Sequence, residues 1–178
     1  MKLYEYEARE IFSKYSIPVP RGFLVRKLNE AYRVLKEVSF PVVIKAQILV
    51  ARRAKLGGVR FANDIEDALS IIKEILGREL NGLKVREILV VEKVDVIREL
   101  YVGFVIDRTS RGIAFIASRY GGIELEDLAK ERPESVIKYG IDVFTGFRDY
   151  IARNTAYKLG LKGESIKDFI KIIRSLYK

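Results

Sequence analysis

The sequence predicts an α+β fold in two lobes that meet near residues 92–99. Three observations support this prediction. A helical pattern leads into a lobe that mixes strand and helix patterns, a strand-rich stretch follows, and two helical patterns close the chain. The 178 residues are enough for one sizeable core or two small lobes. With 49% hydrophobic residues and charges spread throughout, the composition is typical of a globular protein.

The first part of the chain alternates between helix and strand patterns. Apolar residues at near-helical spacing predict a helix over 3–17, which Pro18 and Pro20 end. β-branched runs predict strands, and an amphipathic pattern predicts a second helix. In chain order these elements are a strand at 21–25, a helix at 29–38, a strand at 41–47 and a strand at 58–62.

A third helix is expected from Asp64 to about Gly77, where glycine is a natural C-terminal stop. Asn63 is the predicted N-cap, with Glu66 three residues later completing a capping box.

The second part of the chain is richer in strands and ends in helices. "DRTSRG" predicts a hairpin turn between two strands of alternating pattern. The predicted elements are a turn at 81–84, strands at 86–94, 98–108, 112–120 and 135–141, a short acidic helix at 123–131, and helices at 149–161 and 165–177, the last capped by Ser165.

The chain has no cysteine and no histidine. Disulfides, thiolate nucleophiles, zinc sites and Ser-His-Asp catalysis are therefore excluded within it. Chemistry here must use Lys, Arg, Asp, Glu, backbone amides or a hard metal ion. Many Lys, Glu and Ile residues favour a thermophilic source. No apolar run approaches a membrane span and no secretory signal is visible, so a cytoplasmic location is expected.

The charge balance, 33 basic against 24 acidic residues, gives a net charge of +9. This suits an anionic partner such as a nucleotide, coenzyme A, nucleic acid or an acidic subunit, but a solvated basic surface is an equal alternative. Because the basic residues are dispersed, without a stripe of interleaved aromatics, the pattern argues against nucleic acid as the partner.

Lys45 stands inside the strand pattern "VVIKAQ", where a lysine is rarely buried without a partner. It is either a strand-end lysine that reaches solvent or an ammonium that holds a phosphate. The loop that follows places Arg52, Arg53 and Lys55 before Gly57 and Gly58. Glycines allow backbone N–H groups to approach an anion, and the cations add charge-assisted bonds. A solvated turn is the alternative, and the Walker-type P-loop pattern is absent.

Two further features carry weaker signals. Glu99 lies among apolar strand residues and either accepts a hydrogen bond from a ribose hydroxyl, pairs with a lysine, or lies at the surface. "SRYGGIELEDL" has a glycine pair before a helix with acidic residues in its first turn. A well-capped turn is the preferred interpretation of that pair.

Six stretches, in order and over essentially the whole chain, resemble the β subunits of succinate–CoA ligases and the related archaeal nucleotide-forming acyl-CoA ligases. They are "LYEYEAREIFSKYSIPVPRG", "VVIKAQ", "RRAKLGGVRF", "ILVVEKVDVIRELYVGFVIDR", "IASRYGGIELEDLA" and "AYKLGL".

The resemblance implies a single ATP-grasp domain over 1–178, with a lobe at 21–94 nested between 1–20 and 95–178. ATP or GTP would phosphorylate a histidine of a partner α subunit, the phosphoryl group would pass to a carboxylate, and coenzyme A would displace it. The absent histidine fits, since in this family it belongs to the partner. Catalysis would then consist mostly of positioning and charge neutralisation.

The resemblance also implies nucleotide-binding residues. Lys45 matches the family's phosphate-contacting lysine, and Glu99 matches a glutamate that reaches the nucleotide. The remaining matched positions are Arg52, Arg53 and Ala54 in the phosphate loop, and Val91, Glu92 and Val94 in the strand that lies against adenine. The family usually has a glutamate where Val91 stands, and Glu92 is one place later. Backbone contacts are therefore expected there, with Glu92 as the alternative substitute for that glutamate.

Two departures from the family pattern stand out. Ala51, Arg52 and Ala54 replace loop glycines, which predicts a shifted loop or weaker nucleotide binding, partly offset by Arg52. The family's metal-binding strands, with their Mg²⁺ ligands, are expected outside this chain, as is the C-terminal CoA-ligase domain. The ATP-grasp fold would thus be truncated before those strands. A fragment, a split subunit and a degenerate, non-catalytic module that binds an anion or a partner subunit all remain open.

Overall fold

The computed structural model describes residues 2–50, 53–122, 128, 130 and 132–178. The fold has helices and antiparallel sheets, which confirms the predicted α+β class. It divides into two compact units, each described by itself below: unit 1 comprises Met1–Lys14 and Pro18–Asp95, and unit 2 comprises Tyr15–Ile17 and Val96–Lys178. That the chain forms one domain with a nested lobe at 21–94 stays a prediction.

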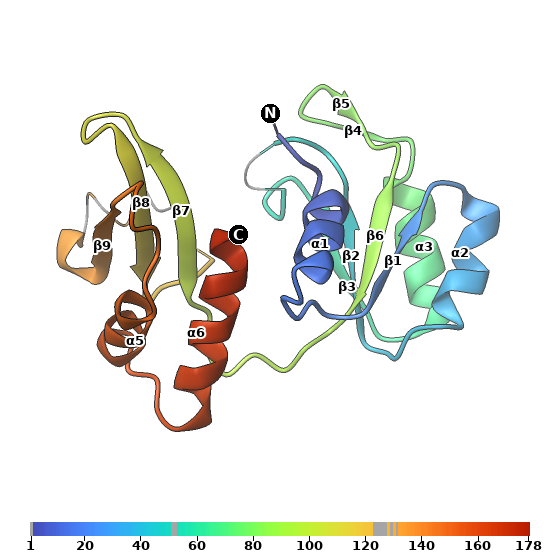
Figure 1. Ribbon diagram of the computed structural model, residues 1–178. Helices are drawn as coiled ribbons and strands as arrows, with labels where there is room; N and C mark the ends of the chain where they lie inside the picture. The colour runs from blue at the N-terminus through green and yellow to red at the C-terminus, as the bar shows by residue number, and fades with distance from the viewer. Residues whose placement is uncertain (1, 51–52, 123–127, 129, 131) are drawn as a thin grey trace. The chain divides into compact units, whose positions relative to one another are not determined.

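Unit 1 is a four-stranded antiparallel sheet with helices on both faces. The strand order is β1-β6-β2-β3, with α1 on one face and α2 and α3 on the other (Figure 1). A small hairpin of β4 and β5 follows α3. The elements are α1 (Glu5–Lys14), β1 (Gly22–Val25), α2 (Leu28–Leu35), β2 (Val42–Ala46), β3 (Val59–Ala62), α3 (Ile65–Ile75), β4 (Glu79–Leu80), β5 (Leu83–Lys84) and β6 (Ile88–Glu92).

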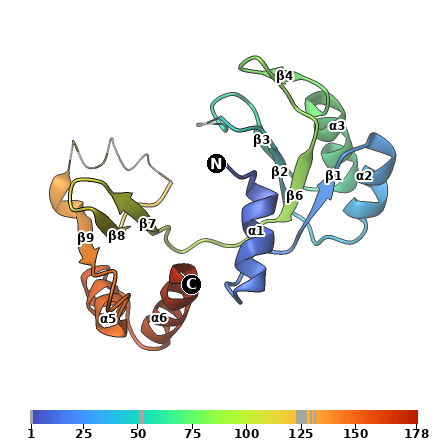
Figure 2. The ribbon, with the colours of Figure 1, turned by 45° about the horizontal axis from the view of Figure 1, so that its top comes forward.

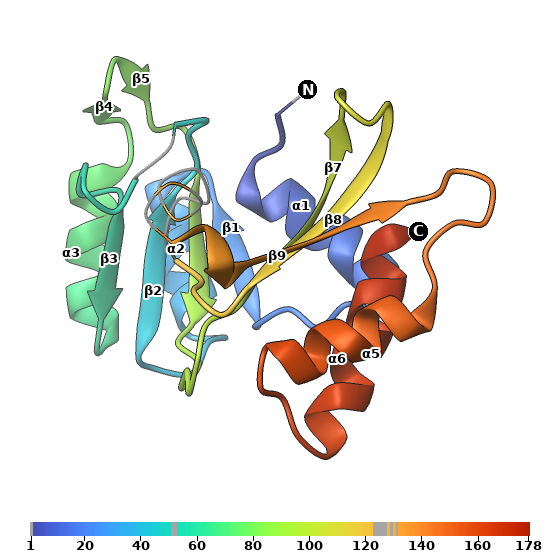
Figure 3. The same ribbon diagram turned by 90° about the vertical axis from the view of Figure 1, so that its left-hand side faces the viewer.

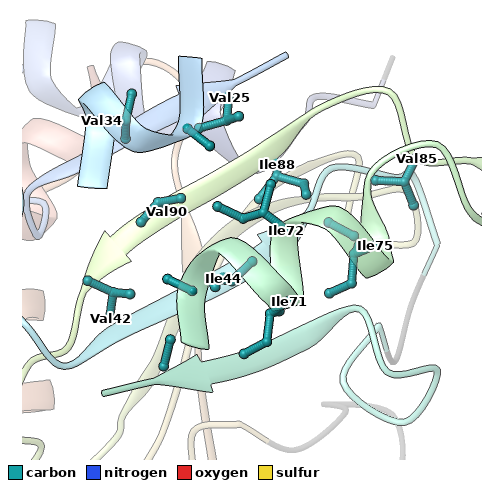
Figure 4. Close-up of a cluster of buried hydrophobic side chains, with 14 of the residues drawn as sticks. Val25, Val34, Val42, Ile44, Ile71, Ile72, Ile75, Val85, Ile88 and Val90 are labelled. Carbon is teal, nitrogen blue, oxygen red and sulfur yellow. The ribbon is translucent and has the colours of Figure 1, made fainter. Parts of the chain in front are cut away.

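The core of unit 1 lies between the sheet and the two helices α2 and α3 (Figure 4). Strand β2 contributes Val42, Ile44 and Ala46, all with 0% exposure, because alternate strand residues face the same side. The residues between them, Val43 and Lys45, therefore face the side of the sheet that carries α1. This alternation decides where Lys45 points.

In unit 1 the predicted turn at 81–84 is present, but the predicted N-cap of α3 is not. The predicted turn at 81–84 is a two-residue hairpin loop, with positive φ at Asn81 and Gly82. The prediction that Asn63 caps α3 is wrong. Asp64 is the N-cap, and its carboxylate accepts from the Asp67 N–H at 2.8 Å, because the chain stays extended for one residue more than expected.

Unit 2 is a three-stranded antiparallel sheet packed against two helices (Figures 2 and 3). The strand order is β7-β8-β9, and the central strand β8 buries Phe115 completely against α5 and α6. The carboxylate of Asp107 closes the β7–β8 hairpin by accepting from the Thr109 N–H at 3.1 Å. The elements are β7 (Tyr101–Asp107), β8 (Gly112–Ser118), η1 (Pro133–Ser135), β9 (Val136–Ile141), α5 (Asp149–Lys158) and α6 (Glu164–Tyr177).

The sequence predicts two features at the helices of unit 2 that the structure does not confirm. The acidic helix at 123–131 falls largely outside the described residues. Ser165 is not the cap of the last helix, since α6 begins at Glu164 and Gly163, with φ of 58°, occupies the N-cap position. Within the described ranges no helix has the length and apolar character that crossing a bilayer requires.

Candidate functional site

Lys45 lies near the end of β2, between Leu89 of β6 and Val59 of β3 in the sheet register. Its two strand neighbours are fully buried on the opposite face. The Lys45 side chain is only 27% exposed, so it is not the solvent-reaching lysine of the simpler interpretation. A lysine held this way at a strand needs a partner.

That partner is Glu5, the first residue of α1. The Lys45 ammonium donates to Oε1 of Glu5 at 2.7 Å. Arg53, from the loop after β2, donates from Nη2 to Oε2 of the same carboxylate at 2.9 Å, and from Nη1 to the carbonyl of Ala46 at 3.0 Å. One carboxylate therefore bridges two of the cations that the sequence singled out.

The cluster of Glu5, Lys45 and Arg53 is largely removed from solvent, with side-chain exposures of 23%, 27% and 24%. Burial acts to raise the pKa of Glu5, but the two neighbouring cations outweigh it and hold the pKa of this carboxyl below its usual 4.5. Glu5 is therefore ionised at neutral pH. Two positive charges and one negative charge leave the cluster a net cation.

Gln47 connects the same helix and strand. Its side chain is buried, with 3% of the residue exposed. Its Oε1 accepts from the Tyr6 N–H at 3.3 Å, and its Nε2 donates to the Lys45 carbonyl at 3.0 Å. Gln47 thereby ties the start of α1 to the end of β2, which keeps Glu5 opposite Lys45.

The loop after β2 uses its glycines for its own closure. The Gly58 N–H donates to the Arg53 carbonyl at 2.9 Å, and the Gly57 N–H donates to the Ala54 carbonyl at 3.1 Å. A Cβ on Gly58 would lie 3.1 Å from the Arg53 carbonyl oxygen, so a larger residue there would press against the turn. These two amides are engaged within the loop, and the candidate anion-binding groups are therefore the cationic side chains.

Ala54 has an ordinary backbone conformation, because positive φ among the described residues other than glycine occurs only at Ser16, Asn81 and Arg111. The shifted loop, or the weaker nucleotide binding, stays a prediction. Arg52, the other predicted loop cation, lies with Ala51 outside the described residues.

The predicted adenine-facing strand corresponds to β6 and the segment after it. Val91 is buried between β1 and β2, opposite Gly22 and Val43, so its backbone polar groups face neighbouring strands. Glu92 is half-buried, and its carboxylate accepts from the Ser39 N–H at 2.9 Å. One oxygen of that carboxylate is therefore engaged within unit 1.

Beyond the end of β6, Val94 is 52% exposed. Its position leaves it accessible to a ligand. The nucleotide-binding roles of Val91, Glu92 and Val94 stay predictions.

Glu99 belongs to unit 2, where it packs against a glycine pair. The Gly121 N–H donates to the Glu99 carbonyl at 3.1 Å. A Cβ on Gly121 would lie 2.8 Å from the Glu99 Cβ, and one on Gly122 would lie 2.6 Å from the Glu99 Oε2. The pair is therefore more than the capped turn expected from sequence: it provides the space that Glu99 occupies.

Sequence reasoning did not identify Glu5, Gln47, Gly121 or Gly122 as parts of the site. The signal available for Glu5 was an acidic residue in the first turn of a helix, which is common for dipole reasons alone. Where the structure describes the chain, no group of three or more His, Cys, Asp or Glu side chains could hold a metal ion.

The family model of the ATP-grasp domain matches residues 2–178. The chain belongs to the ATP-grasp family. Its alternation of antiparallel sheets and helices agrees with that assignment.

Curated relatives of this ATP-grasp chain include β subunits of succinate–CoA ligases. It is 44% identical over 179 residues to the ADP-forming enzyme's β subunit from Bacteroides thetaiotaomicron and 39% identical over 178 residues to that from Ignicoccus hospitalis. It is 38% identical to the GDP-forming β subunit from Thermus thermophilus. Each match covers 100% of this chain and 47–48% of the relative. The chain thus spans about half the length of these curated relatives.

Solved structures agree with the fold. ACD1 of Ca. Korarchaeum cryptofilum, solved in complex with coenzyme A, is 26% identical with a TM-score of 0.70, and the match covers 98% of this chain and 79% of that one. The ATP citrate lyase of Methanothrix soehngenii is 21% identical with a TM-score of 0.65. That match covers 98% of this chain and 43% of the lyase chain. The latter likeness concerns the fold alone.

Proposed function

We propose that this chain is the nucleotide-binding portion of a succinate–CoA ligase-type β subunit. In the proposed reaction, ATP or GTP, a carboxylic acid and coenzyme A give an acyl-CoA, the nucleoside diphosphate and phosphate. The observation that carries the proposal is the meeting of Lys45 and Arg53 on one carboxylate, at 2.7 and 2.9 Å. Two cations held this close together can both donate charge-assisted hydrogen bonds to one polyphosphate. The curated relatives support the reaction class.

In this proposal each candidate residue contacts the part of the nucleotide that its chemistry suits. Lys45 holds a phosphate oxygen as a point charge, and Arg53 adds the planar fork that suits phosphate. Arg52 and Ala54 complete the phosphate loop, and Glu99 accepts from a ribose hydroxyl. Because the chain has no histidine, the phosphorylated histidine is proposed to belong to a partner α subunit.

Magnesium requires several oxygen ligands. Within the described part of the chain the carboxylates form no such group, and Glu5 is bound to two cations. The described residues therefore do not fit a dedicated magnesium site. We propose that the Mg²⁺ ligands lie outside this chain, as the resemblance implies. A cytoplasmic location likewise stays a prediction.

The test is calorimetric titration of the protein with ATP and with GTP, each with and without Mg²⁺. Replacing the Lys45 ammonium by Lys45→Met should weaken ATP binding about 10- to 150-fold, the size of a lost charge-assisted hydrogen bond of roughly 1.5–3 kcal/mol. Lys73→Met, which removes the same charge from an exposed position on α3, is the matched control and should bind as the parent does. An absence of saturable ATP binding by the parent protein would overturn the proposal.

A second candidate function is a non-catalytic module that binds an anion or a partner subunit. It is favoured by the engagement of the Gly57 and Gly58 amides within their own loop. Inorganic tripolyphosphate separates the two candidates in the same calorimeter. Equal affinity for tripolyphosphate and ATP would favour the anion-binding module, whereas tighter ATP binding would favour nucleotide recognition.

A further inference from the structure

Glu5 is placed so that it acts on both phosphate-binding candidates at once. Its two carboxylate oxygens divide between them: Oε1 accepts from Lys45 and Oε2 accepts from Arg53. These residues are 40 and 48 positions away in sequence, and each has a long side chain with many rotamers. A single carboxylate therefore restricts two otherwise mobile cations to one place.

Within the described part of the chain, the contacts of Lys45 and Arg53 leave each of them donors for another ligand. An ammonium has three N–H donors and a guanidinium has five. The contacts described for Lys45 use one of these, and those for Arg53 use two, one to Glu5 and one to the Ala46 carbonyl. About a quarter of each side chain is exposed to solvent.

Glu5 itself is held in place by its surroundings. The Tyr4 N–H donates to the Glu7 carboxylate at 2.7 Å, which caps the start of α1. The Tyr6 N–H donates to the buried Gln47, whose side chain also bonds the Lys45 backbone. Since α1 has no fully buried residue among those described, these polar contacts contribute to positioning the helix start against β2.

The electrostatics favour this arrangement in the absence of a ligand. Lys45 and Arg53 would repel each other if brought together alone, and the ionised Glu5 between them removes that cost. When a polyphosphate arrives, the cations are already ordered, and the cluster still has a net positive charge. Preordering lowers the entropic cost of binding.

We propose that Glu5 is a positioning residue that orients Lys45 and Arg53 to receive the phosphates of the nucleotide. This inference rests on the proposed function, because it assigns phosphate binding to those two cations. Glu5 does not contact the phosphates itself. Its effect passes through Lys45 and Arg53.

The test compares Glu5→Gln with Glu10→Gln by calorimetry, using ATP and inorganic tripolyphosphate as ligands. Both substitutions remove one negative charge from α1, but Glu10 is exposed. We expect Glu5→Gln to weaken both ligands by a similar factor, about tenfold, and Glu10→Gln to leave them unchanged. Glu5→Asp keeps the charge but shortens the side chain, so its affinity for both ligands should lie between those of the parent and Glu5→Gln. It also provides a second variant if Glu5→Gln fails to fold.

A double substitution separates positioning from a general loss of structure. In a Lys45→Met/Arg53→Met background, Glu5→Gln should have no further effect on ligand affinity, because the groups through which it acts are gone. Unchanged or tighter binding by Glu5→Gln, with Lys45→Met still weakening the parent, would overturn this inference and leave the proposed function standing. If the parent binds neither ATP nor tripolyphosphate, the proposed function fails, and the inference fails with it.

Discussion

The two units hold their candidate ligand-binding residues by different means. In unit 1, Lys45 and Arg53 are held by charge, through a carboxylate at the start of a helix. In unit 2, Glu99 is held by shape, because its Cβ and backbone lie against Gly121 and leave no room for a Cβ there. The two units should therefore be sensitive to different changes. The stability of unit 1 should depend on pH and on the charge of Glu5, and that of unit 2 on a single methyl group added beside Glu99.

The largest expected effect comes from the core of unit 2. Phe115→Ala should lower the free energy of unfolding by about 3–5 kcal/mol, because it removes a fully buried ring from the core of unit 2. Denaturation in urea measures the loss. Phe144→Ala, the same substitution at a residue that is 95% exposed, is the control and should change stability little. A loss below about 1 kcal/mol at Phe115 would contradict the packing described here.

A single methyl group tests whether Glu99 is held by shape. Gly121→Ala places a Cβ 2.8 Å from the Glu99 Cβ and 2.9 Å from its backbone carbon. We expect a loss of roughly 1–3 kcal/mol in unfolding free energy, as for other overpacked sites. Gly140→Ala is the matched control, because nothing lies within 4 Å of its Cβ position. Equal stability of the two variants would show that the glycine pair is not needed for space.

Acid titration tests whether unit 1 is held by charge. The pKa of Glu5 in the folded protein lies below its usual 4.5. Its ion pairs therefore stabilise the fold above that value, and this stabilisation disappears as the pH falls through the folded pKa.

The parent should exceed Glu5→Gln in unfolding free energy by about 1 kcal/mol at neutral pH, and the difference should shrink in acid. Lys45 and Arg53 face the Glu5 carboxylate, and Arg9 also lies within electrostatic range of it. A difference that does not depend on pH would contradict the electrostatic account.

The smallest expected effect is on the pKa of Asp107, which forms a surface ion pair in unit 2. In unit 2, the Lys138 ammonium lies 2.7 Å from Asp107, and with the hairpin N–H groups it lowers the pKa of Asp107 to about 2. Lys138→Met should raise that pKa toward its usual 3.8, as carboxyl NMR titration can measure. Lys167→Met, which removes a cation paired with Glu164 instead, should leave Asp107 unchanged.

Several features were predictable because they are local. The strands at 41–47 and 112–120 follow alternation, and the turn at 81–84 follows the conformational freedom of Asn and Gly. Lys45 was identified as unusual because a lysine inside an apolar strand pattern is rarely buried without a partner. Cap positions were less predictable, since Asn63 and Asp64 are both good caps and the extended backbone at Asp64 decides between them.

Residue types and short-range periodicity predicted the α+β class and most of the helices and strands, and the residue count excluded histidine and cysteine chemistry within the chain. The ATP-grasp assignment came instead from the resemblance of six stretches to a known family, and the family model bears it out. The pairing of Glu5 with Lys45 and Arg53, and the space that Gly121 and Gly122 leave for Glu99, became visible in the folded chain alone. Both arrangements join segments at least 22 residues apart, and one-dimensional patterns do not record which charge meets which, or where two backbones approach within van der Waals distance.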